Sequence, residues 1–154
     1  MEYRTMTVGD APFLKRIFSI PEYELYFAEN ETSVADWEER IPLFQNARSL
    51  ILSDGEKDVG WLKYRTEGQV CFIDILVLLP DERRKGYGKE AIQDLLDRNP
   101  QIHVIRLDVQ QRNQPAIAFY RKLGFRVVSE EFQPVGNTRE PYFNMQLDRQ
   151  NLRR

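Results

Sequence analysis

The chain has 154 residues, enough for one domain of ordinary size and too few for two domains that each bury a full core. Hydrophobic residues make up 42% of it and charged residues 30%, which is typical of a folded globular protein and not of a disordered or collagen-like one. With 22 Lys and Arg against 24 Asp and Glu, the formal charge is -2, which gives no overall attraction to nucleic acid or to an anionic membrane.

Capping residues and a hairpin turn mark the first half of the chain. Pro12 precedes apolar residues at helical spacing, which predicts a helix near the N-terminus. Ser33 is a capping residue within a second helical region, and from Ala47 the pattern favours strands around a turn at Asp54-Gly55. The elements predicted in this half are a strand over Glu2–Thr7, helical regions beginning near Pro12 and at Pro21, and strands over Ser49–Ser53 and Asp58–Arg65.

Proline and glycine residues mark the elements of the second half. Pro80 ends a long β-rich run, Asn99-Pro100 ends a helix with one apolar face, and Gly124 ends the next helix. The elements predicted in this half are strands over Gln69–Leu79 and Ile102–Val109, helices over Gly86–Asp97 and Gln114–Leu123, and strands over Phe125–Phe132 and Pro141–Leu147.

The order of these elements predicts the fold class. It runs from one strand to two helical regions, three antiparallel strands, a helix, a strand, a helix and two final strands. This order predicts an α/β (α+β) fold, with a mixed and mostly antiparallel sheet flanked by helices. No internal repeat, low-complexity tract or linker is present, so we expect residues 1–154 to form a single domain.

The chain has one cysteine and one histidine, which exclude two kinds of site. Cys71 has no partner for an internal disulfide, and His103 alone provides no ligand set of the zinc type, so we expect no metal. We interpret Cys71 as a small buried hydrophobe and His103 as structural. The N-terminus has charges where a signal peptide needs an apolar run, and no stretch approaches about 18 consecutive apolar residues. We therefore expect a cytoplasmic protein.

A loop with two glycines follows the most apolar strand. The run Phe72–Leu79 leads into the polar segment Pro80–Lys85, and Gly86 and Gly88 follow where a helix begins. Glycines let main-chain N–H groups approach a ligand closely, and a helix N-terminus attracts anions, so the loop suits a phosphate or pyrophosphate. The alternative is a solvated basic turn with a glycine cap. The basic residues of the loop are Arg83, Arg84, Lys85 and Lys89.

Two known phosphate-binding motifs fit the loop poorly. A P-loop needs a glycine five positions before Gly88, where Arg83 stands. Gly86, Gly88 and Ala91 satisfy the letters of the dinucleotide motif G-x-G-x-x-A, with Asp108 about 20 residues further on. In that motif, however, the glycines directly follow the strand. A dinucleotide-binding protein is therefore the weaker alternative.

Two blocks of the sequence resemble motifs of the Gcn5-related N-acetyltransferase (GNAT) family. The segment Arg83–Gly88 resembles the family's acyl-CoA motif, in which an arginine or glutamine is followed by two residues, a glycine, one residue, and a glycine or alanine. The segment Asn113–Phe125 resembles the second motif, an asparagine leading into a helix with a tyrosine and a following Gly-Phe. Together the blocks lie within Phe72–Phe125, about a third of the chain. The resemblance implies a GNAT-like acyl-CoA N-acyltransferase fold and a single N-acetyltransferase domain over residues 1–154.

The resemblance also implies acetyl-CoA as co-substrate. In the family, the strand before the loop splays from its neighbour, main-chain groups in the resulting cleft bind the pantetheine arm, and the loop binds the pyrophosphate. Arg84 stands where glycine is common in the family, which puts the local backbone geometry in question. The residues that match acetyl-CoA-binding positions are Leu76, Val77, Leu78, Arg83, Arg84, Lys85, Gly86, Tyr87, Gly88, Lys89, Asn113 and Tyr120.

Acetyl transfer requires an acid that protonates the leaving thiolate and a donor that polarises the thioester carbonyl. Tyr120 matches the family's general acid, and its alternative role is packing beside Phe119. The main-chain N–H near Leu78 is the candidate donor. Asn113 is expected to cap a helix and, by resemblance, to bind CoA.

The reaction also requires a base, because a primary amine is mostly ammonium at neutral pH. Asp108 matches a catalytic carboxylate of some family members and is our first choice, its alternative role being a strand-end carboxylate that caps a turn. Asp74 is the second choice. Alternation places Asp74 on one strand face with Phe72, Leu76 and Leu78, where it could instead anchor a substrate ammonium or form a structural ion pair.

These residues predict an acetyl-CoA-dependent N-acetyltransferase in which a primary amine attacks directly within a ternary complex. The acceptor classes left open are a small polyamine, an aminoglycoside-like cation, and a protein N-terminus or lysine. A non-catalytic sensor that binds acetyl-CoA is the alternative function. We expect a monomer or homodimer with no nucleic-acid or membrane partner.

The N-terminal helices are rich in aromatic and acidic residues. We expect the aromatic residues to lie mainly in the core, with a wall of the acceptor pocket as the alternative; they are Tyr23, Tyr26, Phe27, Trp37 and Phe44. The acidic residues form either a solvated face or an acidic rim for a cationic amine; they are Glu22, Glu24, Glu29, Glu31, Glu38 and Glu39.

Overall fold

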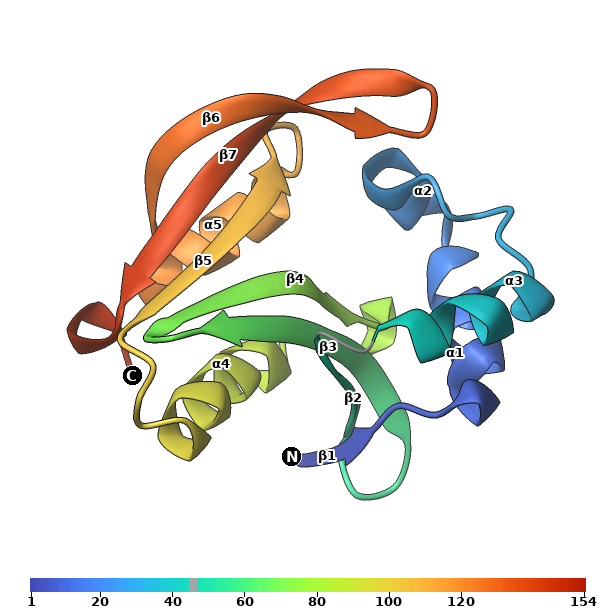
Figure 1. Ribbon diagram of the computed structural model, residues 1–154, viewed down its shortest axis with the longest axis horizontal. Helices are drawn as coiled ribbons and strands as arrows, with labels where there is room; N and C mark the ends of the chain where they lie inside the picture. Colours follow the sequence, from blue (N-terminus) through green and yellow to red (C-terminus); the bar gives the residue numbers. More distant parts are fainter. Residues whose placement is uncertain (45–46) are drawn as a thin grey trace.

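Seven strands form one sheet within residues 1–44 and 47–154, the residues that the computed structural model describes (Figure 1). The strands are β1 (Glu2–Thr5), β2 (Arg48–Ser53), β3 (Asp58–Glu67), β4 (Val70–Leu78), β5 (Val104–Gln110), β6 (Arg126–Val135) and β7 (Thr138–Asp148). Their order in the sheet is β1-β2-β3-β4-β5-β7-β6. Among these described strands only β4 and β5 pair in parallel. The predicted mixed, mostly antiparallel sheet is confirmed, and the doubly wound parallel sheet of the dinucleotide alternative is excluded.

Five α-helices in the described part of the chain flank the sheet. They are α1 (Ala11–Phe18), α2 (Pro21–Phe27), α3 (Val34–Arg40), α4 (Tyr87–Arg98) and α5 (Gln114–Leu123). The second helical region of the sequence is two helices and not one. Ala28 ends α2 in the left-handed conformation, with φ at 52°, and the Ser33 side chain then accepts from the Asp36 N–H to cap α3.

The two C-terminal strands extend further than their sequence pattern predicts. Val135 pairs with Thr138 at the tip of the β6–β7 hairpin. The strands therefore extend through polar residues that show no alternation of apolar and polar side chains. The first strand is shorter than predicted, because η1 (Val8–Asp10), a turn of 3-10 helix, follows it after two residues.

The hydrophobic core has two parts, one on each face of the sheet. Helices α4 and α5 cover one face across both halves of the sheet, from Leu52 and Leu62 to Ile105 and Met145. Helices α1 and α3 cover the opposite face only over β2, β3 and β4, where Trp61 is fully buried. The corresponding face of β5, β7 and β6 is therefore left without a helical layer (Figure 1). The strand register places polar residues such as Asp108, Asn144 and Ser129 on that face. No helix within the described ranges is long and apolar enough to cross a bilayer.

Candidate active site

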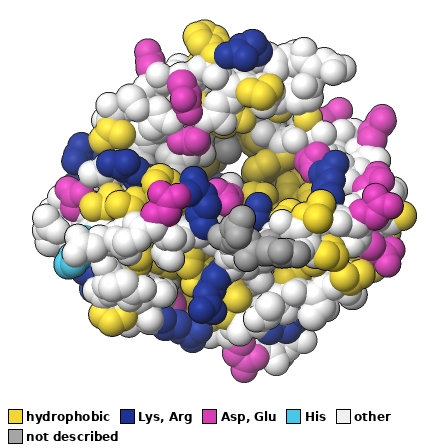
Figure 2. All heavy atoms as spheres, viewed as in Figure 1, with side chains coloured by type: hydrophobic (Ala, Val, Ile, Leu, Met, Phe, Trp, Pro, Cys, Tyr) yellow, Lys and Arg dark blue, Asp and Glu magenta, His cyan; other side chains and the backbone are white. Residues whose placement is uncertain are grey.

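The sheet divides between β4 and β5. Their parallel pairing runs from Val70 with Val104 to Ile73 with Leu107 and stops there, although both strands continue. A β-bulge causes the divergence: β3 pairs with Ile73 and with Ile75, and Asp74 between them has no partner in that ladder. Figure 2 shows the surface hollowed near its centre, with hydrophobic side chains at the bottom of the hollow.

Beyond the bulge, β4 has a free edge. The Leu79 N–H donates to the Val59 carbonyl of β3 at 2.9 Å, so alternation turns the N–H groups of Leu76 and Leu78 away from β3. These groups face the opening between β4 and β5. The predicted segment Leu76, Val77 and Leu78 thus offers main-chain hydrogen-bonding groups to a ligand that lies in the opening.

Because of the bulge, the predicted alternation of side chains along β4 is wrong. Leu76 and Leu78 pack against the core under α4 and α5, with Cys71 and Ile73, whereas Ile75 and Val77 pack under α1 and α3. The side chains therefore change phase at residue 74. Asp74 does not share a regular alternating set with Phe72, Leu76 and Leu78, because the extra residue of the bulge interrupts it.

The loop after β4 adopts the geometry of an anion-binding turn. After η3 (Pro80–Glu82), Arg84 has φ at 63° and Gly86 has φ at 82°, both in the left-handed region. The main-chain N–H groups of Gly86, Tyr87, Gly88 and Lys89 have no acceptor among the described residues. Arg84 therefore adopts a backbone conformation that a glycine favours. Four consecutive free donors at the start of α4 suit a phosphate.

Gly88 has a packing role. A Cβ at this position would lie 2.8 Å from the Cζ of Phe119 in α5. The absence of a side chain lets the first turn of α4 contact α5. Gly86 has a different role, since nothing lies within 4 Å of an added Cβ there. A glycine at this position permits the left-handed backbone conformation.

The basic side chains of the loop point in different directions. Arg83 is half-buried and contacts α2, where it lies over the Tyr23 ring and pairs with Glu22 at 3.0 Å. Lys85 pairs with the buried Glu82 at 3.0 Å. Arg84 and Lys89 have no ionic partner among the described residues, so they are the cations of the loop that remain available to an anion.

Tyr120 lies on α5 and Asn113 caps its start, and the contact of Gly88 with Phe119 positions this helix beside the start of α4. The Tyr120 ring packs between Phe119 and Phe125, with centroid distances of 5.2 Å to each, and no described residue hydrogen-bonds its hydroxyl. Burial raises the pKa of Tyr120, which keeps the phenol protonated at neutral pH. Asn113 caps α5 as predicted, by accepting from the Ala116 N–H at 3.3 Å.

Asp108 lies on the uncovered face of β5, within a polar network. Its Oδ1 accepts from Asn144 Nδ2 at 2.7 Å, and its Oδ2 accepts from Gln133 Nε2 at 2.9 Å. The same two amides also contact the carboxylate of Glu131. Neither Asp108 nor Glu131 pairs with a cation in the described chain, so the network has a net negative charge on the uncovered face of the sheet.

Asp74 and Asp108 have different surroundings. The Asp74 carboxylate is about a third exposed and lies 3.8 Å from the Nζ of Lys63, which in turn sits over the Phe44 ring. Asp74 thus has a cationic neighbour, whereas Asp108 has only amide donors.

The aromatic residues of the N-terminal helices form one cluster. Phe18 stacks on Trp37 at 5.3 Å, and both contact Trp61 edge-on. Tyr23 and Trp37 are buried, while Tyr26 and Phe27 are partly exposed. Among the predicted acidic rim residues, Glu22 pairs with Arg83 and Glu29 pairs with Arg40.

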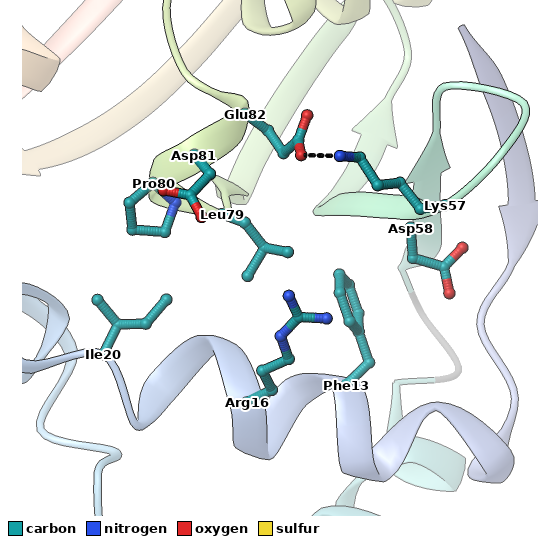
Figure 3. Close-up of a pocket in the computed structure, with 9 residues that line it drawn as sticks. All are labelled: Phe13, Arg16, Ile20, Lys57, Asp58, Leu79, Pro80, Asp81 and Glu82. Carbon is teal, nitrogen blue, oxygen red and sulfur yellow. Dashed lines mark ion pairs between the residues drawn. The ribbon is translucent and has the colours of Figure 1, made fainter.

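A separate cavity of about 510 Å³ lies beside the base of the loop (Figure 3). Phe13 and Arg16 of α1 project into it from below, and the ion pair between Lys57 and Glu82 closes its upper side. Its lining is Phe13, Arg16, Ile20, Lys57, Asp58, Leu79, Pro80, Asp81 and Glu82. No residue predicted for catalysis lines this cavity. It therefore lies apart from the candidate site at the divided sheet.

Several residues of the site have no signal in the sequence. Gln133 and Asn144 hold the two carboxylates, yet nothing in the sequence pattern of their strands indicates these contacts. Tyr23 donates its hydroxyl hydrogen to the Leu78 carbonyl, a partner 55 positions away. Cys71 is buried as predicted, and burial raises the pKa of its thiol to about 12. A thiol in that state is not a nucleophile.

Comparison with protein families gives one match over most of the chain. The model described as "Acetyltransferase (GNAT) family" matches residues 12–125. Peptidyl-lysine N-acetyltransferase YiaC from Escherichia coli (strain K12) is 32% identical over 102 residues, which cover 63% of this chain and 66% of that protein. The match thus spans slightly less than two thirds of that relative's length.

Solved structures give matches over nearly the whole chain. Spermidine N-acetyltransferase from Vibrio cholerae, in complex with CoA and spermine, has a TM-score of 0.79 at 17% identity and covers 97% of this chain and 96% of its own. Aminoglycoside acetyltransferase AAC(6')-Ib, in complex with coenzyme A and kanamycin, has a TM-score of 0.77 at 21% identity, with coverage of 97% and 95%. These likenesses confirm the predicted fold.

Proposed function

This chain belongs to the GNAT family of acetyltransferases, and we propose that it transfers the acetyl group of acetyl-CoA directly to a primary amine within a ternary complex. The observation that carries the proposal is the row of unpartnered main-chain N–H groups from Gly86 to Lys89, placed beside the opening between β4 and β5. A diphosphate on the loop and an extended thioester arm in the opening would satisfy both features.

On the donor side, we assign the diphosphate to the loop amides, with Arg84 and Lys89 as neighbouring cations. The arm would extend along the free edge of β4 and hydrogen-bond the main chain of Leu76 and Leu78. The Leu78 N–H is also the assigned donor to the thioester carbonyl, where negative charge develops during attack. Asn113, whose Nδ2 has no partner in the described chain, is the remaining side-chain contact.

On the acceptor side, Asp108 is the assigned general base, with Asp74 as the second candidate. Asp108 would take a proton from the ammonium, directly or through water, and the freed nitrogen lone pair would attack the carbonyl carbon. The carbon–sulfur bond then breaks, and the nitrogen releases its second proton to solvent, from which Tyr120 recovers the proton that it gives to the sulfur. Tyr120 would donate its phenolic proton to the departing sulfur, a role supported by burial that keeps the phenol protonated. No covalent intermediate on the protein is needed.

A positively charged primary amine is the acceptor class we propose. The unneutralised carboxylates of Asp108 and Glu131 on the uncovered face support it. Related proteins bear names that point to three kinds of amine: a peptidyl lysine, spermidine and an aminoglycoside. These three kinds define the panel to be tested.

The test is release of free thiol from acetyl-CoA in the presence of a lysine peptide, spermidine or kanamycin. We expect at least one amine to raise the release rate well above the rate without amine, with the acetylated amine detected by mass spectrometry. Binding of acetyl-CoA without any amine-dependent release would overturn the proposal and favour a sensor. Failure to bind acetyl-CoA in calorimetry would overturn both the proposed transferase and the sensor alternative.

A further inference from the structure

Helix α2 lies across the opening between β4 and β5 and contacts both of its sides. At its start, the Tyr23 hydroxyl donates to the Leu78 carbonyl at the end of β4. Near its end, the Tyr26 carbonyl accepts from Gln110 Nε2 of β5 at 3.0 Å. Ala28 then contacts the β6–β7 turn, where a Cβ on Gly136 would lie 3.2 Å from the Ala28 Cβ. Figure 1 shows α2 facing the tip of the β6–β7 hairpin.

The Tyr23 hydroxyl has two partners, one on β4 and one on the loop. It donates its hydrogen to the Leu78 carbonyl and accepts from Arg83 Nη2. Burial raises the pKa of Tyr23, an effect that the Arg83 guanidinium partly offsets, so the phenol remains a donor at neutral pH. One buried hydroxyl thus joins α2 to the strand and to the first residue of the anion-binding loop.

The described contacts of the Arg83 guanidinium are with α2. Its Nη2 donates to Tyr23, its Nη1 pairs with Glu22 at 3.0 Å, and its Cζ lies 4.9 Å from the centre of the Tyr23 ring. A phosphate at this guanidinium would lie close to the Glu22 carboxylate and would be repelled by it. Arg84 and Lys89 have no such competitor among the described residues. Arg83, the first residue of the loop motif, therefore points toward α2, on the acceptor side of the opening.

We propose that Tyr23 and Arg83 are positioning residues that hold α2 over the opening, so that Arg83 serves acceptor placement and not diphosphate binding. The proposal rests on the acetyl transfer proposed above. It assigns the diphosphate to the loop amides with Arg84 and Lys89. Loss of either positioning residue removes part of the contact that holds the start of α2, which lets the wall of the acceptor hollow move while leaving the loop amides in place.

The test compares Tyr23→Phe, Arg83→Gln and the double variant with a matched control, Arg84→Gln, which removes a cation one position further along the same loop. Calorimetric Kd for CoA needs no turnover. Hydrogen exchange of the α2 amides reports its mobility, and steady-state kinetics separate KM for the amine from kcat.

We expect both single variants to speed exchange in α2 and to raise KM for the amine about tenfold, with the CoA Kd within about threefold of wild type. The double variant should have a larger effect than either single variant, because Tyr23→Phe leaves the ion pair of Arg83 with Glu22 and Arg83→Gln leaves the bond of Tyr23 to Leu78. Arg84→Gln should weaken CoA binding several-fold and leave α2 exchange unchanged. The opposite pattern, in which Arg83→Gln weakens CoA binding at least as much as Arg84→Gln while α2 exchange stays as in wild type, would overturn the proposal. If the wild type transfers no acetyl group, the proposed function fails, and the exchange and Kd measurements still decide the role of Arg83.

Discussion

The two sides of the opening between β4 and β5 are built from different groups. The donor side presents main-chain N–H groups, on the loop from Gly86 to Lys89 and along the edge of β4, that lack protein partners in the described chain. The acceptor side presents side chains that are already bonded to one another, with Asp108 held by Asn144 and Gln133. One side is therefore fixed by backbone conformation and the other by a network of side chains.

This difference predicts how each side responds to substitution. A main-chain site depends on φ and ψ, so most side chains within it can change as long as the backbone does not. A side-chain network depends on each donor and acceptor, so a single isosteric change alters it. Glycine spacing in a sequence can indicate the first kind of site, whereas the second kind depends on residues far apart in the chain.

Tyr120 lies on the donor side but acts through its side chain, so it should not tolerate substitution. Its replacement should have the largest effect on activity of the changes predicted here. Tyr120→Phe removes the proton donor for the departing sulfur while keeping the ring between Phe119 and Phe125. We expect kcat to fall by roughly 10²–10⁴, with the Kd of CoA nearly unchanged. Tyr64→Phe is the control, because it removes the hydroxyl of another buried tyrosine of the same core, on β3. An unchanged kcat for Tyr120→Phe would show that its hydroxyl is not the acid.

Asp108 tests the acceptor side. Asp108→Asn removes the base but retains an oxygen that can accept from the neighbouring amides. We expect the rate at pH 7 to fall by about 10², and the deficit to shrink as pH rises, because amines then arrive deprotonated. The measurement is kcat/KM against pH. Glu131→Gln, a change in the same network, should leave the shape of the profile unaltered. If Asp74→Asn moves the profile and Asp108→Asn does not, Asp74 is the base.

The sequence predicts the donor side better than the acceptor side for physical reasons. Helix α5 begins and ends where predicted, because Asn113 caps it and Gly124 adopts φ of 114° at its end. The bulge at Asp74 is not visible in the sequence, because β4 is apolar on both faces. When the side chains change faces at the bulge, the hydrophobic pattern of the strand stays the same. Tyr23 looks like a core aromatic and is buried like one, and only the fold brings its hydroxyl to Leu78 and Arg83.

Gly86 offers a sharper test of the donor side. Gly86→Ala adds a Cβ that meets nothing within 4 Å, so its cost is the left-handed backbone at φ of 82°. That cost is about 1–2 kcal/mol, and we expect the CoA Kd to rise about tenfold as the loop shifts to relieve it. Gly68→Ala is the matched control, because Gly68 also has a positive φ and open space but lies in the β3–β4 turn. It should lower thermal stability similarly and leave the Kd unchanged. Equal Kd values for the two variants would contradict a backbone-dependent site.

The smallest expected effect concerns the base of the loop, where the donor side does rely on side chains. The Glu82 carboxylate pairs with Lys57 at 2.7 Å and with Lys85 at 3.0 Å, and hydrogen bonds from these ammonium groups, Lys57 first, lower its pKa below the usual 4.5. Because the pKa is lower in the folded state, the pair stabilises the fold above about pH 4.5 and this contribution disappears as pH falls through the folded-state pKa. Glu82→Gln should therefore be less stable than wild type at pH 7, and the two urea-unfolding free energies should converge toward pH 3. Glu67→Gln is the control, since Glu67 pairs with Arg65 at an exposed site and should stay close to wild type throughout. A stability difference between Glu82→Gln and wild type that is the same at pH 7 and pH 3 would mean that packing of the side chain, and not its charge, anchors the loop.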